Sequence, residues 1–178
     1  MFSSEDLKWE TPWWLINHLR EYWNLDFTLD PCCTPATAKA PNFFTPEDNG
    51  LEQDWGGHIV FMNPPYGREQ IQWIQKAHAE SEKENTTVMC LVPARTDTKV
   101  WHEIIFPHAS QIYFIKGRIK FGKDGVKANS APFPSALAVF DGIYDNQIIM
   151  TMELPPKKDR DHSIPWYMNQ EVAGASEE

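Results

Sequence analysis

The sequence predicts an α/β fold in which helices cover a mostly parallel sheet with an antiparallel strand. Short apolar runs with the length of buried strands alternate with segments whose apolar residues recur at helical spacing. The chain has 178 residues, which is enough to bury a substantial core but too short to add a large second domain. We therefore expect one domain, at residues 1–150, with a sheet of reduced size.

The first part of the chain is expected to contain one helix and three strands. Thr11 and Pro12 are typical of a helix start, with the threonine hydroxyl as cap and proline in the first helical position. Apolar residues then repeat at helical spacing as far as residue 23. Strands are predicted at residues 25–30, 42–44 and 58–62, the last of them an uninterrupted apolar run suited to a central parallel strand.

The second part of the chain continues the same alternation. Helices are predicted at residues 69–84 and 98–106, and strands at residues 86–92, 111–115 and 135–140. From residue 151 onwards, prolines mix with charges of both signs. We expect residues 151–178 to form a C-terminal extension that is partly flexible.

The tetrapeptide Asn63-Pro64-Pro65-Tyr66 follows the apolar run 58–62 directly and carries the main chemical signal. The exocyclic nitrogen of adenine is a poor nucleophile because its lone pair is delocalised into the ring. The Asn63 side-chain oxygen and the Pro64 carbonyl can accept its two hydrogens, since successive prolines stiffen the backbone. Tyr66 offers a ring face for an extruded base. The pattern predicts methyl transfer to a planar amine; an ordinary turn is the alternative.

Asp30 stands at the end of the predicted strand 25–30, as Asn63 stands at the end of 58–62. Ligands of α/β sheets bind beyond the carboxyl ends of the strands, so we expect Asp30 and Asn63 to face one crevice. A simple Asp-Pro turn is the alternative for Asp30.

Six short motifs occur in a fixed order between residues 8 and 141. They are TP at 11–12, DPCC at 30–33, NPPY at 63–66, LVPAR at 91–95, KGR at 116–118 and APFPS at 131–135. In this order they resemble the small phage-type, Dam-like DNA adenine methyltransferases. The resemblance implies a class I, Rossmann-like sheet, and methyl transfer from S-adenosylmethionine to the exocyclic amine of adenine in duplex DNA, with base flipping.

The resemblance also implies a cofactor site. Asp30 would lie near the methionine ammonium of S-adenosylmethionine, and Thr11, followed by Pro12, near its carboxylate. The backbone from Pro31 to Thr34, Cys32 included, would form the floor of the cofactor loop, although this loop lacks the glycines usual in such loops. Neither of its cysteines is needed as a nucleophile, because the methyl group of a sulfonium is already activated.

Asp54 resembles the acidic residue that accepts a hydrogen bond from the adenine of the cofactor, with a surface carboxylate as the alternative. Glu47 and Asp48 are the candidates for the ribose hydroxyls.

The net charge of −9 argues at first sight against a nucleic-acid partner. Residues 1–60, however, hold 3 basic and 10 acidic side chains, whereas residues 93–127 hold 7 basic and 3 acidic ones. A basic stretch with aromatic residues suits a groove that follows phosphates and steadies a flipped base. A solvated basic surface is the alternative.

We expect a basic loop around residues 116–134 to contact double-stranded DNA, with Gly122 and Gly125 allowing it to move. Arg118 is a candidate for reading guanine and Arg95 for contacting phosphate. Phe133 is equally compatible with a core position. The residues expected to contact DNA are Arg95, Lys116, Arg118, Lys120 and Phe133.

Other functions stay open at this point. Asn63 in the first motif position favours adenine by family association only, so cytosine, RNA and protein glutamine are alternative substrates. A DNA-binding module without catalytic activity is the alternative of another class.

The remaining expectations concern metals, membranes and assembly. The three cysteines and six histidines lack the spacing of metal ligands, so we expect no metal. No apolar stretch has the length of a membrane span, and the first residues lack a signal-peptide pattern. We expect a cytoplasmic protein of a bacterium or phage-infected host cell, as a monomer or weak dimer.

Overall fold

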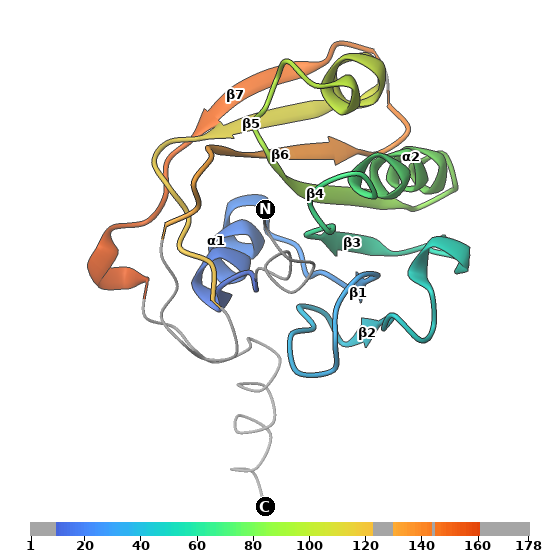
Figure 1. The fold of residues 1–178 in the computed structure, drawn as a ribbon, viewed down its shortest axis with the longest axis horizontal. Helices are drawn as coiled ribbons and strands as arrows, with labels where there is room; N and C mark the ends of the chain where they lie inside the picture. Colours follow the sequence, from blue (N-terminus) through green and yellow to red (C-terminus); the bar gives the residue numbers. More distant parts are fainter. Residues whose placement is uncertain (1–9, 123–129, 144, 161–178) are drawn as a thin grey trace, which may run out of the picture.

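The structure is a computed structural model that describes residues 10–122, 130–143 and 145–160. The described residues form a seven-stranded sheet with helices on both faces (Figure 1). The strands are β1 (Leu29–Asp30), β2 (Asn42–Phe43), β3 (Ile59–Met62), β4 (Thr87–Pro93), β5 (Gln111–Ile115), β6 (Ser135–Phe140) and β7 (Ile148–Met152). Each of the strands predicted from the sequence is present, although β1 is shorter than expected.

The strands are arranged in the order β2-β1-β3-β4-β6-β5-β7. All neighbouring strands pair in parallel except β6, which is antiparallel to both β4 and β5. The predicted α/β sheet, mostly parallel with an antiparallel strand, is confirmed. This arrangement is consistent with the Rossmann-like class of methyltransferases.

The strand order reverses between β1 and β3. From β1 the chain continues to β2 on one side, whereas β3 and β4 extend the sheet on the other side. Leu29 of β1 pairs with Val60 of β3, so the carboxyl ends of these two strands lie next to each other. Such a switch point leaves a crevice beyond the strand ends, which is where ligands of open α/β sheets bind.

Helix α1 (Trp13–Trp23) covers one face of the sheet. It buries Leu15, Ile16 and Leu19 in a cluster with side chains of the central strands. The predicted cap is wrong: the helix begins after Pro12, and no side chain caps it. The Thr11 hydroxyl instead accepts a hydrogen bond from Asn63, so this residue belongs to the crevice rather than to the helix.

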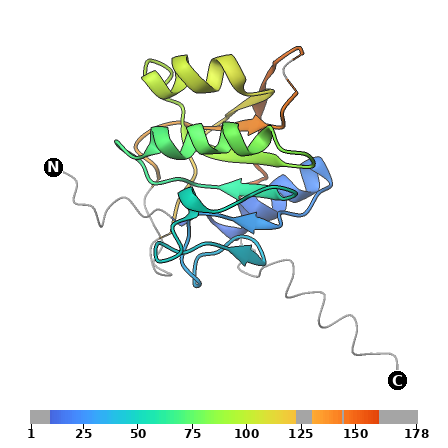
Figure 2. The same ribbon diagram turned by 90° about the vertical axis from the view of Figure 1, so that its right-hand side faces the viewer.

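The opposite face is covered by α2 (Gln70–Ser81) and by a helical segment at residues 101–108 (Figure 2). That segment consists of the π-helical turn η3 (Trp101–Ile105) followed by α3 (Phe106–His108). Trp101 is fully buried, and its indole nitrogen donates a hydrogen bond to the Pro93 carbonyl at 2.9 Å. The bond fixes the helical segment to the end of β4.

Side chains of the central strands alternate between the two faces. In β4, Met89 and Leu91 pack on the α1 side, whereas Cys90 and Val92 pack on the α2 side. Because both faces are buried, the sequence of β4 is continuously apolar rather than alternating. The core therefore consists of two layers, and the strand ends between them remain available for a site.

Strand β7 was not predicted. It pairs in parallel with β5 at the edge of the sheet, and the expected start of the C-terminal extension at residue 151 falls inside it. Ile148, Ile149 and Met150 are 48%, 57% and 44% exposed, and only Met152 of this strand is buried, so the strand lacks the alternation of buried and exposed residues on which sequence patterns depend. A short 3-10 turn, η4 (Lys157–Asp159), follows, and residues 161–178 lie outside the described ranges.

Candidate active site

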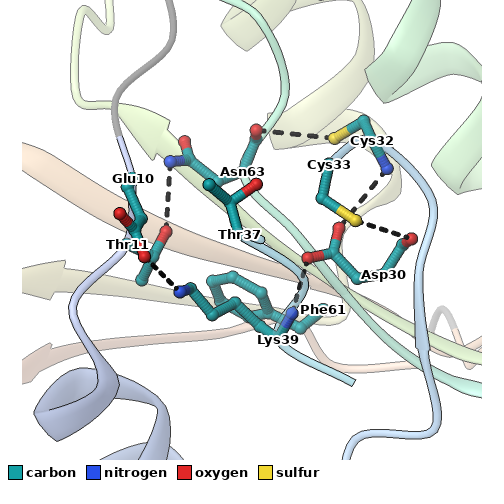
Figure 3. Close-up of a pocket in the computed structure, with 9 residues that line it drawn as sticks. All are labelled: Glu10, Thr11, Asp30, Cys32, Cys33, Thr37, Lys39, Phe61 and Asn63. Carbon is teal, nitrogen blue, oxygen red and sulfur yellow. Dashed lines mark hydrogen bonds and ion pairs between the residues drawn. The ribbon is translucent and has the colours of Figure 1, made fainter. Parts of the chain in front are cut away.

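A pocket opens at the switch point, beyond the carboxyl ends of β1 and β3 (Figure 3). Its walls come from the segment before α1, the loop after β1, and the end of β3. It is lined by Glu10, Thr11, Asp30, Cys32, Cys33, Thr37, Lys39, Phe61 and Asn63. The sequence prediction that Asp30 and Asn63 share one crevice agrees with this geometry.

Asp30 is the buried carboxylate of the pocket, with only 4% of its surface exposed. Its two oxygens accept hydrogen bonds from the backbone nitrogens of Cys32, at 3.3 Å, and Lys39, at 3.0 Å. Burial raises the pKa of Asp30 to about 6, although these hydrogen bonds act in the opposite direction. The carboxylate is thus held in place by the loop that follows it.

Lys39 runs along the pocket floor, with its backbone at Asp30 and its ammonium at Glu10 (Figure 3). The ammonium donates to Glu10 Oε1 at 3.0 Å and lies 4.5 Å from the centre of a Trp13 ring. The Lys39 side chain is 3% exposed and that of Glu10 is 25% exposed. The pocket therefore has a buried positive charge beside its buried carboxylate.

Asn63 is held by hydrogen bonds on both sides of its amide group. Its Nδ2 donates to the Thr11 hydroxyl at 3.1 Å, and its Oδ1 accepts from the Tyr66 hydroxyl at 3.0 Å. The Cys32 thiol donates to the Asn63 backbone oxygen at 3.4 Å. The side-chain oxygen that the sequence analysis assigns to the target amine thus points at Tyr66 in this structure.

Tyr66 connects the tetrapeptide to two of the residues expected to contact DNA. Its ring meets Phe133 edge-on, with centroids 5.1 Å apart and planes at 90°. The guanidinium of Arg95 lies 5.4 Å from the centre of the Phe133 ring. Phe133 is only 8% exposed and packs in the core on the α1 side, which agrees with the alternative reading of this residue.

Gly50, in the turn η2 (Gly50–Glu52), lets this turn pack closely against the loop that follows β1. A Cβ atom at this position would lie 2.0 Å from the Pro31 carbonyl oxygen, closer than any real contact. The Pro31 carbonyl therefore packs directly against Gly50. Sequence reasoning missed this residue because it lies outside the loop.

The thiols of Cys32 and Cys33 are poor nucleophiles here. Burial raises the pKa of both, and the neighbouring Asp30 charge acts in the same direction. Both thiols therefore remain protonated near neutral pH.

Asp54 is not brought to the pocket. It precedes β3 at the amino end of the strand, is 79% exposed and forms an ion pair with Lys83 at 2.8 Å. The hydrogen bond from Lys83 lowers the pKa of Asp54 to about 2. Asp54 is therefore positioned as a surface carboxylate, which was the alternative to a role in binding the cofactor's adenine. Glu47 and Asp48 are also exposed and do not line the pocket, and the Asp48 carboxylate accepts hydrogen bonds from Thr45.

The basic residues lie on the surface after β5. Lys116, Arg118 and Lys120 are exposed, whereas Ile119 and Phe121, on either side of Lys120, are buried. Lys116 forms an ion pair with Glu153 at 2.8 Å. Gly125 lies outside the described residues.

The segment that carries these basic residues, here called the basic run (residues 116–122), is connected to the pocket by backbone hydrogen bonds. Gly122 forms two backbone hydrogen bonds with Glu10, at 2.9 and 3.0 Å. A second bridge joins Lys120 to Ser130. Glu10 thus takes part in the pocket through its side chain and in the basic segment through its main chain.

Four pocket residues were missed from the sequence, namely the charged pair Lys39 and Glu10 together with Thr37 and Phe61. The only signal was a single lysine in the otherwise uncharged stretch Pro31–Phe44. Within the described ranges, no three histidine, cysteine or acidic residues are grouped as a metal site requires. No helix in these ranges is long and apolar enough to span a membrane.

Comparison with known proteins agrees with the geometry. A family model described as DNA N-6-adenine-methyltransferase (Dam) matches residues 2–163. A DNA N-6-adenine-methyltransferase of Haemophilus phage HP1 (strain HP1c1) is 34% identical over 142 residues, which is 78% of this chain and 80% of the relative. The chain therefore belongs to the DNA N-6-adenine-methyltransferase (Dam) family.

Proposed function

We propose that this chain transfers a methyl group from S-adenosylmethionine to the exocyclic amine of adenine in duplex DNA. The pocket at the switch point holds the cofactor, and Asn63 receives the adenine amine at its edge. The observation that carries this proposal is the placement of Asp30 and Asn63 in one pocket, at the ends of adjacent strands.

The pocket residues fit the cofactor. A carboxylate buried at Asp30 is a partner for an ammonium group, and charged partners are strongest where water is excluded. The Pro31 and Cys32 backbone forms a floor whose position Gly50 fixes. Thr11, positioned by Pro12 at the start of α1, offers a hydroxyl. When bound, S-adenosylmethionine supplies a methyl group that the sulfonium has already activated.

Asn63 and Pro64 orient the amine. The Asn63 oxygen has two lone pairs, so it can accept from an adenine amine beside the Tyr66 hydroxyl or in its place. The Pro64 carbonyl accepts the second hydrogen, and Pro65 keeps this segment stiff. Held in this way, the amine nitrogen would direct its lone pair at the methyl group that S-adenosylmethionine supplies, and methylation would leave the nitrogen with one extra proton. The extra proton leaves to water.

Tyr66, Phe133 and Arg95 form the wall on which an extruded base stacks. Tyr66 provides the ring face, and the edge-on contact with Phe133 holds that ring in position. Arg95 lies beside this pair with its charge directed to phosphate. Arg118, Lys116 and Lys120 contact the duplex further away.

The reaction is tested by incubating the protein with S-adenosylmethionine labelled in the methyl group and unmodified duplex DNA, followed by nucleoside analysis. We expect the label in N6-methyl-2′-deoxyadenosine. Label in methylcytosine would change the target base, and label only in RNA or in protein glutamine, supplied in parallel, would change the substrate. If the protein bound DNA but transferred no label to DNA, RNA or protein, it would be a DNA-binding module without catalytic activity.

Asn63→Ala tests the role of the tetrapeptide. Loss of the acceptor should lower the transfer rate by at least about 100-fold, by analogy with the loss of one transition-state hydrogen bond, while cofactor affinity changes little. Gln72→Ala, an exposed position on α2, is the matched control and should retain full activity. An Asn63→Ala protein with the wild-type rate would remove this mechanism.

A further inference from the structure

We propose that Lys39 binds the carboxylate of the cofactor's methionine part, and that Glu10 occupies this place until the cofactor enters. The inference rests on the proposed function, because it assigns one end of the same cofactor. It adds Lys39 as a binding residue outside the sequence motifs, and it adds the replacement of Glu10 by the cofactor's carboxylate as the ion-pair partner of Lys39.

The Lys39 side chain is almost completely buried. A buried ammonium is strongly destabilising unless it is paired. Within the described residues, its carboxylate partner is Glu10 at 3.0 Å, and the Trp13 ring supports it at 4.5 Å. Any molecule that enters this pocket must therefore either leave the pair intact or replace Glu10 with another anion.

Glu10 is suited to being replaced. Its side chain is 25% exposed, so a rotation moves the carboxylate into water. Its main chain stays in place because it is hydrogen-bonded to Gly122 in both directions. Exchange of one carboxylate for another keeps Lys39 paired, and the buried charge remains compensated throughout.

The two charges of the pocket match an amino-acid group. The Asp30 carboxylate is hydrogen-bonded to the backbone nitrogen of Lys39, and the Lys39 ammonium lies at the other end of the same side chain (Figure 3). The length of the Lys39 side chain therefore separates the negative group of the pocket from its positive group. An α-amino acid carries its ammonium and its carboxylate on one carbon, with opposite signs. The Thr11 hydroxyl accepts from Asn63, which leaves its proton to donate to the same carboxylate.

The test measures binding of S-adenosylmethionine and of decarboxylated S-adenosylmethionine to the full chain by calorimetry, without DNA. The two ligands differ only in the carboxylate. Wild-type protein should bind the complete cofactor about 10- to 100-fold more tightly, the range for a hydrogen bond to a charged group. In Lys39→Met most of this difference should disappear, because the affinity for S-adenosylmethionine falls whereas that for the decarboxylated form changes little.

Glu10→Gln provides the second arm. Without the competing carboxylate, the affinity for S-adenosylmethionine should rise several-fold, whereas that for the decarboxylated form should not. Lys76→Met is the matched control, since Lys76 also pairs with a glutamate, Glu80, and lies over a tryptophan ring, Trp55. That variant should behave as wild type toward both ligands.

The outcomes separate the inference from the proposed function. Wild-type protein that binds neither ligand contradicts the proposed function itself. Equal wild-type affinities, or equal losses for both ligands in Lys39→Met, overturn the role of Lys39 and leave a structural ion pair. If Lys39→Met does not fold, Glu10→Gln decides: a higher affinity supports the exchange, and an unchanged or lower affinity contradicts it.

Discussion

Asp30 combines deep burial with a raised pKa, so the proposed contact with the cofactor's ammonium would make cofactor binding sensitive to pH. In the cofactor-free protein the carboxyl group has a pKa of about 6 because of desolvation. An ammonium partner requires the charged carboxylate, so binding below pH 6 must displace a proton. Affinity should therefore fall with decreasing pH, approaching about tenfold per pH unit below the pKa.

The measurement is a titration with S-adenosylhomocysteine between pH 5 and pH 7. Asp30→Asn should bind weakly across this range and lose most of the dependence, because no proton is exchanged at this position. A wild-type affinity that stays constant from pH 7 to pH 5 would contradict the assignment of Asp30 to the ammonium.

The same pKa affects the stability of the cofactor-free protein with the opposite sign. The folded state retains the Asp30 proton up to about pH 6, whereas an unfolded chain loses it near the ordinary value of 3.8. Between these values the folded state binds more protons, so the Asp30 contribution to the free energy of unfolding decreases as the pH rises. Above pH 6 the burial penalty is fully present, and a bound ammonium offsets it.

Individual site residues differed in how far the sequence could place them. Asn63 and Asp30 could be placed because each ends a strand, and strand ends meet at one edge of a parallel sheet. Lys39 and Glu10 could not, since neither lies in a motif and their contact joins segments far apart in the chain. Asp54 was assigned by resemblance alone, and it lies at the opposite end of its strand.

The turn η2 and the loop after β1 act as one packed unit, and Gly50→Ala tests this. The added methyl group would lie 2.0 Å from the Pro31 oxygen, so the loop must move. We expect a loss of stability of about 1–3 kcal/mol, as for other overpacked sites, with weaker cofactor binding. A thermal melt measures the loss of stability, and a ligand titration measures the loss of cofactor affinity.

Gly56→Ala is the matched control for this loop. Its Cβ would meet the ends of the Asp54 and Lys83 side chains, at 3.1 and 3.3 Å, which can move aside. Cofactor affinity should be unchanged in this variant. Equal effects of the two substitutions would show that the Pro31 contact is not what positions the loop.

Among the elements, the buried strands were the easiest to predict. Strands β5 and β6 have the predicted bounds. Each is a largely apolar run with turn residues on both sides, which leaves little choice of where the strand begins and ends. β7 was missed since an exposed edge strand has no buried face to impose a pattern. The capping prediction for Thr11 was wrong because a tertiary hydrogen bond to Asn63 uses that hydroxyl.

At the scale of the whole molecule, a chain with a net charge of −9 must bind DNA through a localised basic surface. Lys120 is exposed in this surface, and Lys120→Ala should weaken binding to all DNA sequences alike. The slope of log affinity against log salt should become shallower by about 0.9, the value for one phosphate contact. Fluorescence titrations at several salt concentrations measure this slope.

Lys83→Ala is the comparison for this experiment, because Lys83 pairs with Asp54 and Glu80 at the amino ends of the strands. Its removal should leave the slope unchanged. If the two variants show the same slope as wild-type protein, the surface after β5 does not contact the duplex.

The two backbone hydrogen bonds between Glu10 and Gly122 have a consequence for attempts to redesign the target preference. The basic run ends at Gly122, which is hydrogen-bonded to Glu10 in the wall of the pocket proposed to hold the cofactor. A library selected only for a new recognition sequence would therefore also select changes in cofactor affinity. Such variants need to be screened at several cofactor concentrations, so that altered recognition is not mistaken for altered saturation.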